Sequence, residues 1–280
     1  MGILKIALFG KFSGHSDDSY LGLDAAKLQE LLSYLILFRD RPHRREQLAA
    51  LFWDASSTAL SKKYLRQALW QLQSYLSAAS NCECVIQDPE WVRFNIDAGV
   101  ELDVAVFEQA FTATEGIAGE HMTDEQAGAL KDAVMLYKGD LLEGWYQDWC
   151  IEERARYQDI YTEALHKLMC WCAAREQYEA AIAYGRRILH KDCAHERTHQ
   201  ELMRLYYLSN NRSAALRQYQ LCANFLEREL AVKPSRRTQE LFEQIQADHL
   251  DQVRSAEPAL IAYDVATLKR VLDYLGEMQG

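Results

Sequence analysis

A repeat of 34 residues in the C-terminal half is the feature that most limits the folds open to this chain. The segments KLMCW and ELMRL begin at Lys167 and Glu201, and EAAI and SAAL recur at the same offset of 34. Coincidence in a protein rich in alanine and leucine is the alternative, but it does not explain one shared offset. A period of this length is typical of tetratricopeptide-like helix pairs. We predict a helical-repeat domain in which Ala181 and Ala215 occupy equivalent tight helix contacts.

The N-terminal third predicts a different architecture. Apolar residues alternate in ILKIALFGKFSG, which indicates strands, and then recur at helical spacing in three segments. Asp24 is the expected N-cap of the first helix and Pro42 closes it. The segment CVIQDPEWVRFNI places two β-rich runs around a turn, as in a hairpin. We predict strands within 3–14, helices over 24–40, 44–55 and 56–79, and a hairpin over 84–96, which is the pattern of a winged helix-turn-helix.

The predicted fold class is therefore mainly α, with two domains and a tail. Residues 1–97 form a winged helix-turn-helix of the α+β type, and residues 98–255 form an α-helical tetratricopeptide-like domain. A long helix in this domain is expected to end near residue 234, at AVKPS. Residues 256–280 are predicted to be a C-terminal helical tail.

The charge distribution favours contact with nucleic acid in one region only. The chain has a formal net charge of −10, yet residues 1–97 contain 11 Lys and Arg against 11 Asp and Glu. Seven of these basic residues lie between Arg39 and Tyr75, against three acidic ones. Local potential, rather than total charge, governs contact with phosphates.

The third predicted helix has two different faces. At 100° per residue, one face consists of leucines, namely Leu65, Leu69, Leu72 and Leu76. The opposite face contains Lys63, Gln67, Trp70, Gln71 and Ser74, with Arg66 on its flank. Two amides and an indole opposite the leucines are not expected in a core helix unless that side contacts a partner.

These side chains suit a major groove. Lysine and arginine bind phosphate or guanine, glutamine pairs with adenine, and an indole packs on a thymine methyl group or a sugar. Basic residues also begin the second helix and lie on the hairpin. The predicted DNA-binding residues are Arg44, Arg45, Lys62, Lys63, Arg66, Gln67, Trp70, Gln71, Ser74 and Arg93. Two alternatives stay open: Trp70 and the glutamines pack on the helical domain, or the arginines only form a solvated turn.

The sequence gives little support for metal binding or catalysis. Cys193, His195 and His199 have partial zinc spacing without an evident fourth ligand, so surface histidines at a helix N-terminus are the expectation. We find no phosphate-binding glycine loop, G-x-S-x-G elbow or H-E-x-x-H motif, and predict neither enzyme activity, metal nor cofactor. Scattered cysteines indicate reduced thiols in helix cores. Without a signal peptide or an apolar run of about 18 residues, a cytoplasmic protein with no membrane partner is expected.

The chain resembles SARP-type bacterial transcriptional activators over residues 3–247. The segments LGLDAAKLQELLSYLILFRDRPHRREQLAALFW, LRQALWQLQSYL and VRFN resemble the winged-helix effector domain of response regulators. YKGDLLEG and AALRQY…LERELAVKPS resemble the bacterial transcriptional activator domain that follows it. The resemblance implies double-stranded DNA binding by the third helix and wing, and activation through RNA polymerase.

One departure from the family keeps rival functions open. Relatives have arginine-rich third helices, whereas Gln71, Gln73 and Ser74 occupy that region here. The main rival is therefore a protein-interaction or signalling adaptor with a vestigial winged helix. A third hypothesis is a small-molecule sensor whose groove is lined by Tyr206, Tyr207 and Tyr219. A homodimer, and a further effector domain beyond residue 280, also stay open.

Overall fold

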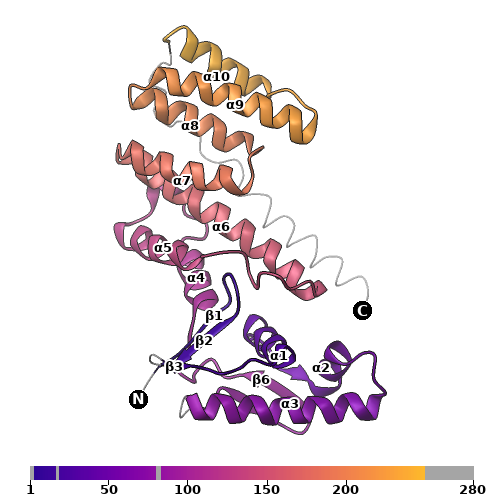
Figure 1. The fold of residues 1–280 in the computed structure, drawn as a ribbon. Helices are drawn as coiled ribbons and strands as arrows, with labels where there is room; N and C mark the ends of the chain where they lie inside the picture. The colour runs from indigo at the N-terminus through magenta and orange to yellow at the C-terminus, as the bar shows by residue number, and fades with distance from the viewer. Residues whose placement is uncertain (1–2, 17–18, 80–82, 250–280) are drawn as a thin grey trace, which may run out of the picture. The chain divides into compact units, whose positions relative to one another are not determined.

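The computed structural model describes residues 3–16, 19–79 and 83–249 (Figure 1). Its contacts define two compact units. The first unit comprises Met1–Ala110 and Asp132–Ile160, and the second comprises Phe111–Lys131 and Tyr161–Gly280. The boundary expected at residue 97 for an independently folding domain stays a prediction.

The elements follow the order expected from the sequence. Those of the winged helix and its connection are β1 (Leu4–Ala7), β2 (Ser13–Ser16), β3 (Ser19–Tyr20), α1 (Ala26–Leu37), β4 (His43–Arg44), α2 (Arg45–Phe52), α3 (Thr58–Ala79), β5 (Val85–Gln87), β6 (Trp91–Phe94), β7 (Glu101–Leu102) and α4 (Asp103–Thr112). They are followed by a 3-10 turn, η1 (Gly119–His121), and by α5 (Asp124–Leu136), α6 (Asp148–Ala174), α7 (Tyr178–Lys191), α8 (Glu196–Leu208), α9 (Arg212–Leu230) and α10 (Arg236–Gln246). The predicted tail over 256–280 lies outside the described residues.

Two small sheets frame the winged helix. The first has the strand order β3-β2-β1-β7, and β1 pairs with β7 in parallel. The second has the order β4-β6-β5 and is antiparallel, with Val85 opposite Phe94. The predicted hairpin is thus present, and with the three helices it confirms the winged helix-turn-helix fold class.

The leucines of α1 and α3 form the core between these sheets. Leu31, Leu32 and Leu35 of α1 are buried, as are Leu65, Leu69, Leu72 and Leu76 of α3. Burying each such side chain contributes roughly 1.5–3 kcal/mol. The N-cap prediction was wrong: α1 begins at Ala26, its N-cap is Ala25, and no side chain caps it. Asp24 lies one residue before the N-cap position, and its backbone N–H donates to the carbonyl of Gly22.

The half-buried carboxylate of Asp103 joins the end of β1 to the start of α4. The backbone N–H groups of Leu8 and Phe9 each donate to Asp103 at 2.9 Å, and that of Val104 donates at 2.7 Å. Burial raises the pKa of Asp103, although these N–H groups favour its charged form. The Phe9 ring also lies 5.2 Å from the ring of Phe107, centre to centre. The segment after β1 is therefore fixed to α4 by both polar and aromatic contacts.

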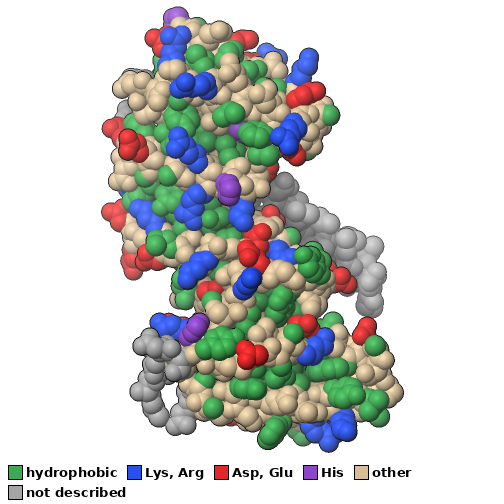
Figure 2. Space-filling model, in the orientation of Figure 1, with side chains coloured by type: hydrophobic (Ala, Val, Ile, Leu, Met, Phe, Trp, Pro, Cys, Tyr) green, Lys and Arg blue, Asp and Glu red, His purple; other side chains and the backbone are tan. Residues whose placement is uncertain are grey.

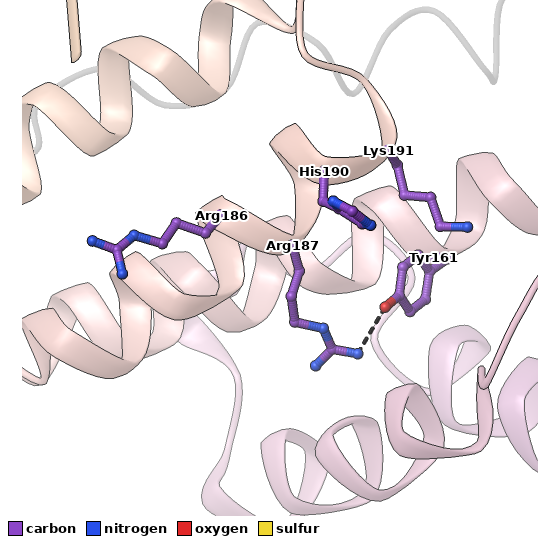
Figure 3. Close-up of a pocket in the computed structure, with 5 residues that line it drawn as sticks. All are labelled: Tyr161, Arg186, Arg187, His190 and Lys191. Carbon is purple, nitrogen blue, oxygen red and sulfur yellow. Dashed lines mark hydrogen bonds between the residues drawn. The ribbon is translucent and has the colours of Figure 1, made fainter. Parts of the chain in front are cut away.

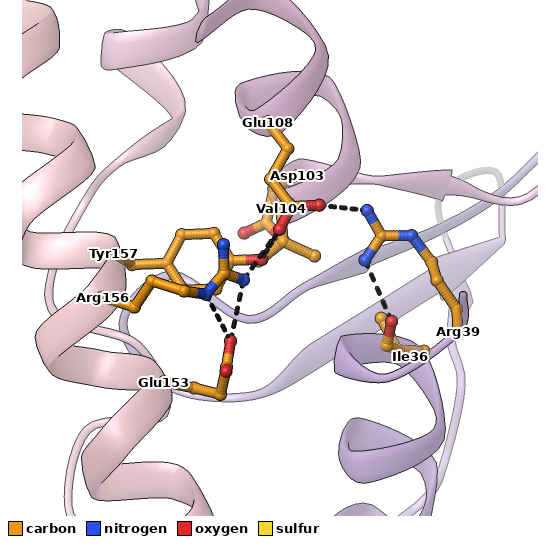
Figure 4. A network of polar contacts seen from close by, with 8 residues as sticks. All are labelled: Ile36, Arg39, Asp103, Val104, Glu108, Glu153, Arg156 and Tyr157. Atoms are coloured by element: carbon orange, nitrogen blue, oxygen red, sulfur yellow. Dashed lines mark hydrogen bonds and ion pairs between the residues drawn. The ribbon is translucent and has the colours of Figure 1, made fainter. Parts of the chain in front are cut away.

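A second polar cluster links α1, α4 and α6 within the first unit (Figure 4). Glu108 Oε1 accepts hydrogen bonds from Arg156 at 2.8 Å and from the Tyr157 hydroxyl at 2.7 Å, and its other oxygen pairs with Arg39. Arg156 also donates to Glu153 at 2.8 Å. Burial would raise the pKa of Glu108, but hydrogen bonds from Arg156 and Tyr157 and the charge of Arg39 outweigh it, so the pKa is lowered.

The second unit has the predicted repeat. Helices α7 to α10 stack one on the next (Figure 1). Ala181 in α7 and Ala215 in α9 are both 0% exposed. Glu176 and Asn210 precede these helices with positive φ of 58° and 59°, so the two turns have the same geometry 34 residues apart. The tetratricopeptide-like arrangement is therefore confirmed.

The end of α9 differs from the prediction. The helix ends at Leu230, four residues before Pro234, because Ala231 adopts the left-handed conformation with φ of 55° and its N–H closes on the carbonyl of Glu227. Among the described residues, no helix is both long and apolar enough to cross a membrane.

The repeat contacts give a stability prediction. Ala181→Leu or Ala215→Leu should lower the free energy of unfolding by roughly 1–3 kcal/mol, because neither site has room for three more carbons. Ala180→Leu is the matched control, since Ala180 is exposed on the same turn of α7. Thermal denaturation measures the effect. Equal melting temperatures for all three variants and the unmodified chain would contradict the tight contact.

The Glu108 cluster gives a pH prediction. Its folded-state pKa lies below the ordinary 4.5, so its charge stabilises the fold above that value, and this contribution is lost as pH falls through the lowered pKa. Glu108→Gln should cost about 2 kcal/mol at pH 7 and show a flatter loss of stability between roughly pH 5 and pH 3. Urea denaturation across this range measures both.

The control for this experiment is Glu240→Gln, which breaks an exposed pair with Arg236. It should change stability by no more than about 0.5 kcal/mol. Parallel pH profiles for Glu108→Gln and the unmodified chain would refute the role of the Glu108 charge.

Candidate nucleic-acid interface

Helix α3 buries its leucine face and exposes the opposite one. Leu65, Leu69, Leu72 and Leu76 are at most 2% exposed. On the other side Trp70 is 68% exposed, Gln71 is half-buried, and Lys63, Gln67 and Ser74 are exposed. In the orientation of Figure 1, the edge formed by the winged helix carries hydrophobic and basic side chains close together (Figure 2). The predicted outer face therefore exists as a surface.

The basic residues at the start of α3 differ in their surroundings. Lys62 forms an ion pair of 2.6 Å with Glu46 of α2, and this hydrogen bond lowers the pKa of Glu46. Lys63 and Arg66 are exposed, and neither forms an ion pair within the described part of the chain. Lys62 must leave Glu46 before it can contact a phosphate, whereas Lys63 and Arg66 need no such change.

Arg44 at the end of β4 and Arg45 at the start of α2 contact the hairpin instead of lying on the outer face of α3. Arg44 lies with its guanidinium carbon 5.1 Å from the centre of the Trp91 ring, and Arg45 donates to the carbonyl of Asp88 at 2.8 Å. Arg93 is exposed on β6, between the buried Val92 and Phe94. The three arginines thus lie on or against the wing, whose turn also carries Asp88 and Glu90.

Several exposed apolar residues of α3 were missed by the sequence analysis. Leu60, Tyr64 and Tyr75 are 45%, 38% and 41% exposed. At 100° per residue, these three residues fall on the flank beside Gln71 and away from the buried leucines. Their exposure could therefore have been predicted from their spacing in the sequence. On the other flank, Gln73 accepts a hydrogen bond of 3.3 Å from Gln87 of β5. The outer face thus has an apolar flank and a wing-side flank.

The histidines considered for zinc have other roles. His199 is 1% exposed, with Nε2 at 2.9 Å from the carbonyl of Cys193 and Nδ1 at 2.7 Å from the Gln218 amide. The expectation of surface histidines was wrong for this residue, because α9 covers it. Burial lowers the pKa of His199. Nowhere in residues 3–16, 19–79 and 83–249 do three His, Cys, Asp or Glu side chains meet in a geometry that could hold a metal ion.

The second unit contains a cleft of about 300 Å³ between α6 and α7 (Figure 3). It is lined by Tyr161, Arg186, Arg187, His190 and Lys191. Arg187 donates to the Tyr161 hydroxyl at 2.7 Å, whereas Arg186 points toward α8 and donates to Tyr206. This basic cleft was not anticipated from the sequence.

The three tyrosines proposed for a ligand groove do not line this cleft. Tyr206 is buried, the Tyr207 hydroxyl donates to Asp248 at 3.2 Å, and Tyr219 stacks on Phe242 with ring centres 4.2 Å apart. Each therefore has a structural role in the packing of α8, α9 or α10.

Comparison with known proteins places the chain in a family. The model of the bacterial transcriptional activator domain matches residues 102–246. No curated protein matches the chain. The structure is similar to that of Mycobacterium tuberculosis EmbR in complex with a low affinity phosphopeptide, with a TM-score of 0.75, 19% identity, and coverage of 98% of this chain and 72% of that chain. At this identity the likeness concerns the fold alone.

These findings agree with the resemblance to SARP-type activators in both fold and family. The matched domain spans just over half of the sequence, including the repeat of α7 and α9. The chain belongs to the family of transcriptional regulators that contain the bacterial transcriptional activator domain.

Proposed function

We propose that this chain is a DNA-binding transcriptional activator that inserts α3 into the major groove, with the β5–β6 hairpin against the adjacent backbone. One observation carries the proposal: the leucine face of α3, from Leu65 to Leu76, is buried, while the face opposite it is exposed and combines Lys63, Gln67 and Trp70. Helices that read the major groove present such a mixture of cation, amide and apolar groups.

The predicted residues divide into two roles under this proposal. Lys63 and Arg66 lie toward the first half of α3 and Arg93 on the wing, where they would contact phosphates. Arg44, Arg45 and Lys62 join them at the edge of the interface. Gln67, Trp70, Gln71 and Ser74 face the base pairs.

The helical-repeat unit is proposed to serve regulation and contacts with other proteins, RNA polymerase among them. Family membership supports this role, and a regulator of transcription of this kind would act in the cytoplasm. Solenoid-like repeats offer extended surfaces for such contacts.

The adaptor hypothesis is the second candidate. It is favoured by the pairing of Lys62 with Glu46, which reduces the positive charge offered to a phosphate, and by the net charge of −10. Under that hypothesis the outer face of α3 binds a protein, and duplex DNA has no effect on it.

Phosphate and base contacts should respond differently to substitution. Lys63→Ala should weaken binding to all duplexes alike and reduce the slope of log K against log salt by about one, because one fewer counterion is released. Gln67→Ala should cost about 1–3 kcal/mol at one base position only. Fluorescence anisotropy with specific and random duplexes separates the two effects.

The matched control is Lys5→Ala, since Lys5 pairs with Glu101 in the other sheet. It should leave both affinity and salt slope unchanged. Equal loss on specific and random DNA for Lys63→Ala and Gln67→Ala would refute the division of roles.

Trp70 offers a direct test of DNA against protein as the partner. Its indole is 68% exposed, so acrylamide should quench its emission readily, and duplex at moderate salt should reduce that quenching. The Trp70 signal is obtained as the difference between the unmodified chain and Trp70→Phe. A signal that duplex leaves unchanged even at low salt would favour the adaptor hypothesis.

A further inference from the structure

We infer that the DNA site read by α3 is centred on A·T pairs and that a thymine methyl group is one of the features it recognises. The inference rests on the proposed function and names the class of sequence that this surface fits. It follows from what occupies the middle of the outer face of α3 and what lies only at its edges.

The cations lie at the periphery of this face. Lys62 is paired with Glu46, and Arg44 and Arg45 contact Trp91 and the Asp88 carbonyl of the wing. Lys63 is exposed one helical turn, or about 6 Å, before Gln67, and Arg66 projects about 100° away from Gln67 around the helix axis, on the flank of the face. Guanine is read most often by arginine or lysine aimed at O6 and N7. The residues one and two helical turns after Lys63 are Gln67 and Gln71, which carry amides and not cations.

Two amides occupy the centre. Gln67 and Gln71 are one helical turn apart, or about 6 Å, which matches roughly two base steps of 3.4 Å. A glutamine amide can donate to N7 and accept from N6 of one adenine at once. By contrast, the Gln73 amide is engaged by Gln87, and the Ser74 hydroxyl donates to the carbonyl of Trp70 at 3.0 Å. Gln67 and Gln71 are therefore the amides positioned to pair with adenine.

An apolar surface adjoins these amides. Trp70 is 68% exposed and lies about 60° from Gln67 around the axis, on the side away from Gln71, whereas Tyr64 and Tyr75 are exposed on the opposite side, beside Gln71. The thymine C5-methyl is the apolar group that base pairs present in the major groove. Two amides with exposed apolar side chains on both sides thus complement adenine and thymine together.

The experiment selects duplexes from a random pool with the full chain at low salt and then modifies the enriched duplex. We expect an A·T core. Replacing its contacted thymidine by deoxyuridine, which removes only the methyl group, should weaken binding about fourfold. Replacing its contacted adenine by 7-deazaadenine, which removes the N7 acceptor, should weaken binding roughly tenfold.

Variants assign each effect to a side chain. Trp70→Ala should bind the thymidine and deoxyuridine duplexes equally but still discriminate against 7-deazaadenine. Gln67→Ala or Gln71→Ala should show the opposite pattern at its own adenine. Tyr146→Ala is the control, because Tyr146 is 80% exposed in the loop before α6, and it should retain both sensitivities. All four substituted side chains are exposed or half-buried, and equal melting temperatures confirm intact folding.

The outcomes separate this inference from the proposed function. Enrichment of G·C cores, or an unmodified chain indifferent to both base analogues, would overturn the inference while leaving DNA binding in place. Binding without any enrichment would overturn it as well. Absence of binding to every duplex at low salt would overturn the proposed function itself.

Discussion

The winged helix depends on the carboxylate of Asp103. It accepts backbone N–H bonds from Leu8, Phe9 and Val104, and so joins the end of β1 to the start of α4. Since β7 pairs in parallel with β1, the helices α1 to α3 and the hairpin all lie within the chain segment that this contact closes. Closing so long a segment carries an entropic cost, and several buried hydrogen bonds to one charged group are strong enough to offset much of it. The exposed face of α3 is thus held by a contact outside α3.

Apolar burial and polar contacts have different effects in the first unit. The leucines of α1 and α3 supply most of the stabilisation without specifying direction, because apolar burial is non-directional. The Glu108 cluster supplies direction, since its carboxylate contacts Arg39, two residues after the end of α1, together with Arg156 and Tyr157 of α6. Charge-assisted bonds of this kind fix one arrangement among the many that the leucines alone would tolerate.

The features predictable from the sequence are those that periodicity encodes. The leucine face of α3, the hairpin around Pro89 and the repeat of Ala181 and Ala215 all follow from spacing within one segment. The Asp103 and Glu108 contacts join residues 95 and 69 positions apart, and no periodic pattern reports them. The same holds for Lys62 and Glu46, which lie on different helices. His199 was assigned to the surface because its cover comes from α9, a helix whose packing the spacing around His199 does not reveal.

The small number of cations on the outer face of α3 has a physical explanation under the proposed function. Cations bind phosphate on every sequence alike, so a helix rich in arginine gains affinity without discrimination. The outer face of α3 includes Gln67, Trp70 and Gln71, whose side chains suit some bases better than others in hydrogen bonding or apolar contact. If the proposed function holds, an acidic protein with such a face would bind random DNA weakly, which would sharpen the contrast between a matched site and the rest of a genome. Under the proposed function, the low cation content of α3 would favour selectivity over affinity, and Arg44, Arg45 and Arg93 at the wing would add the electrostatic attraction that the helix lacks.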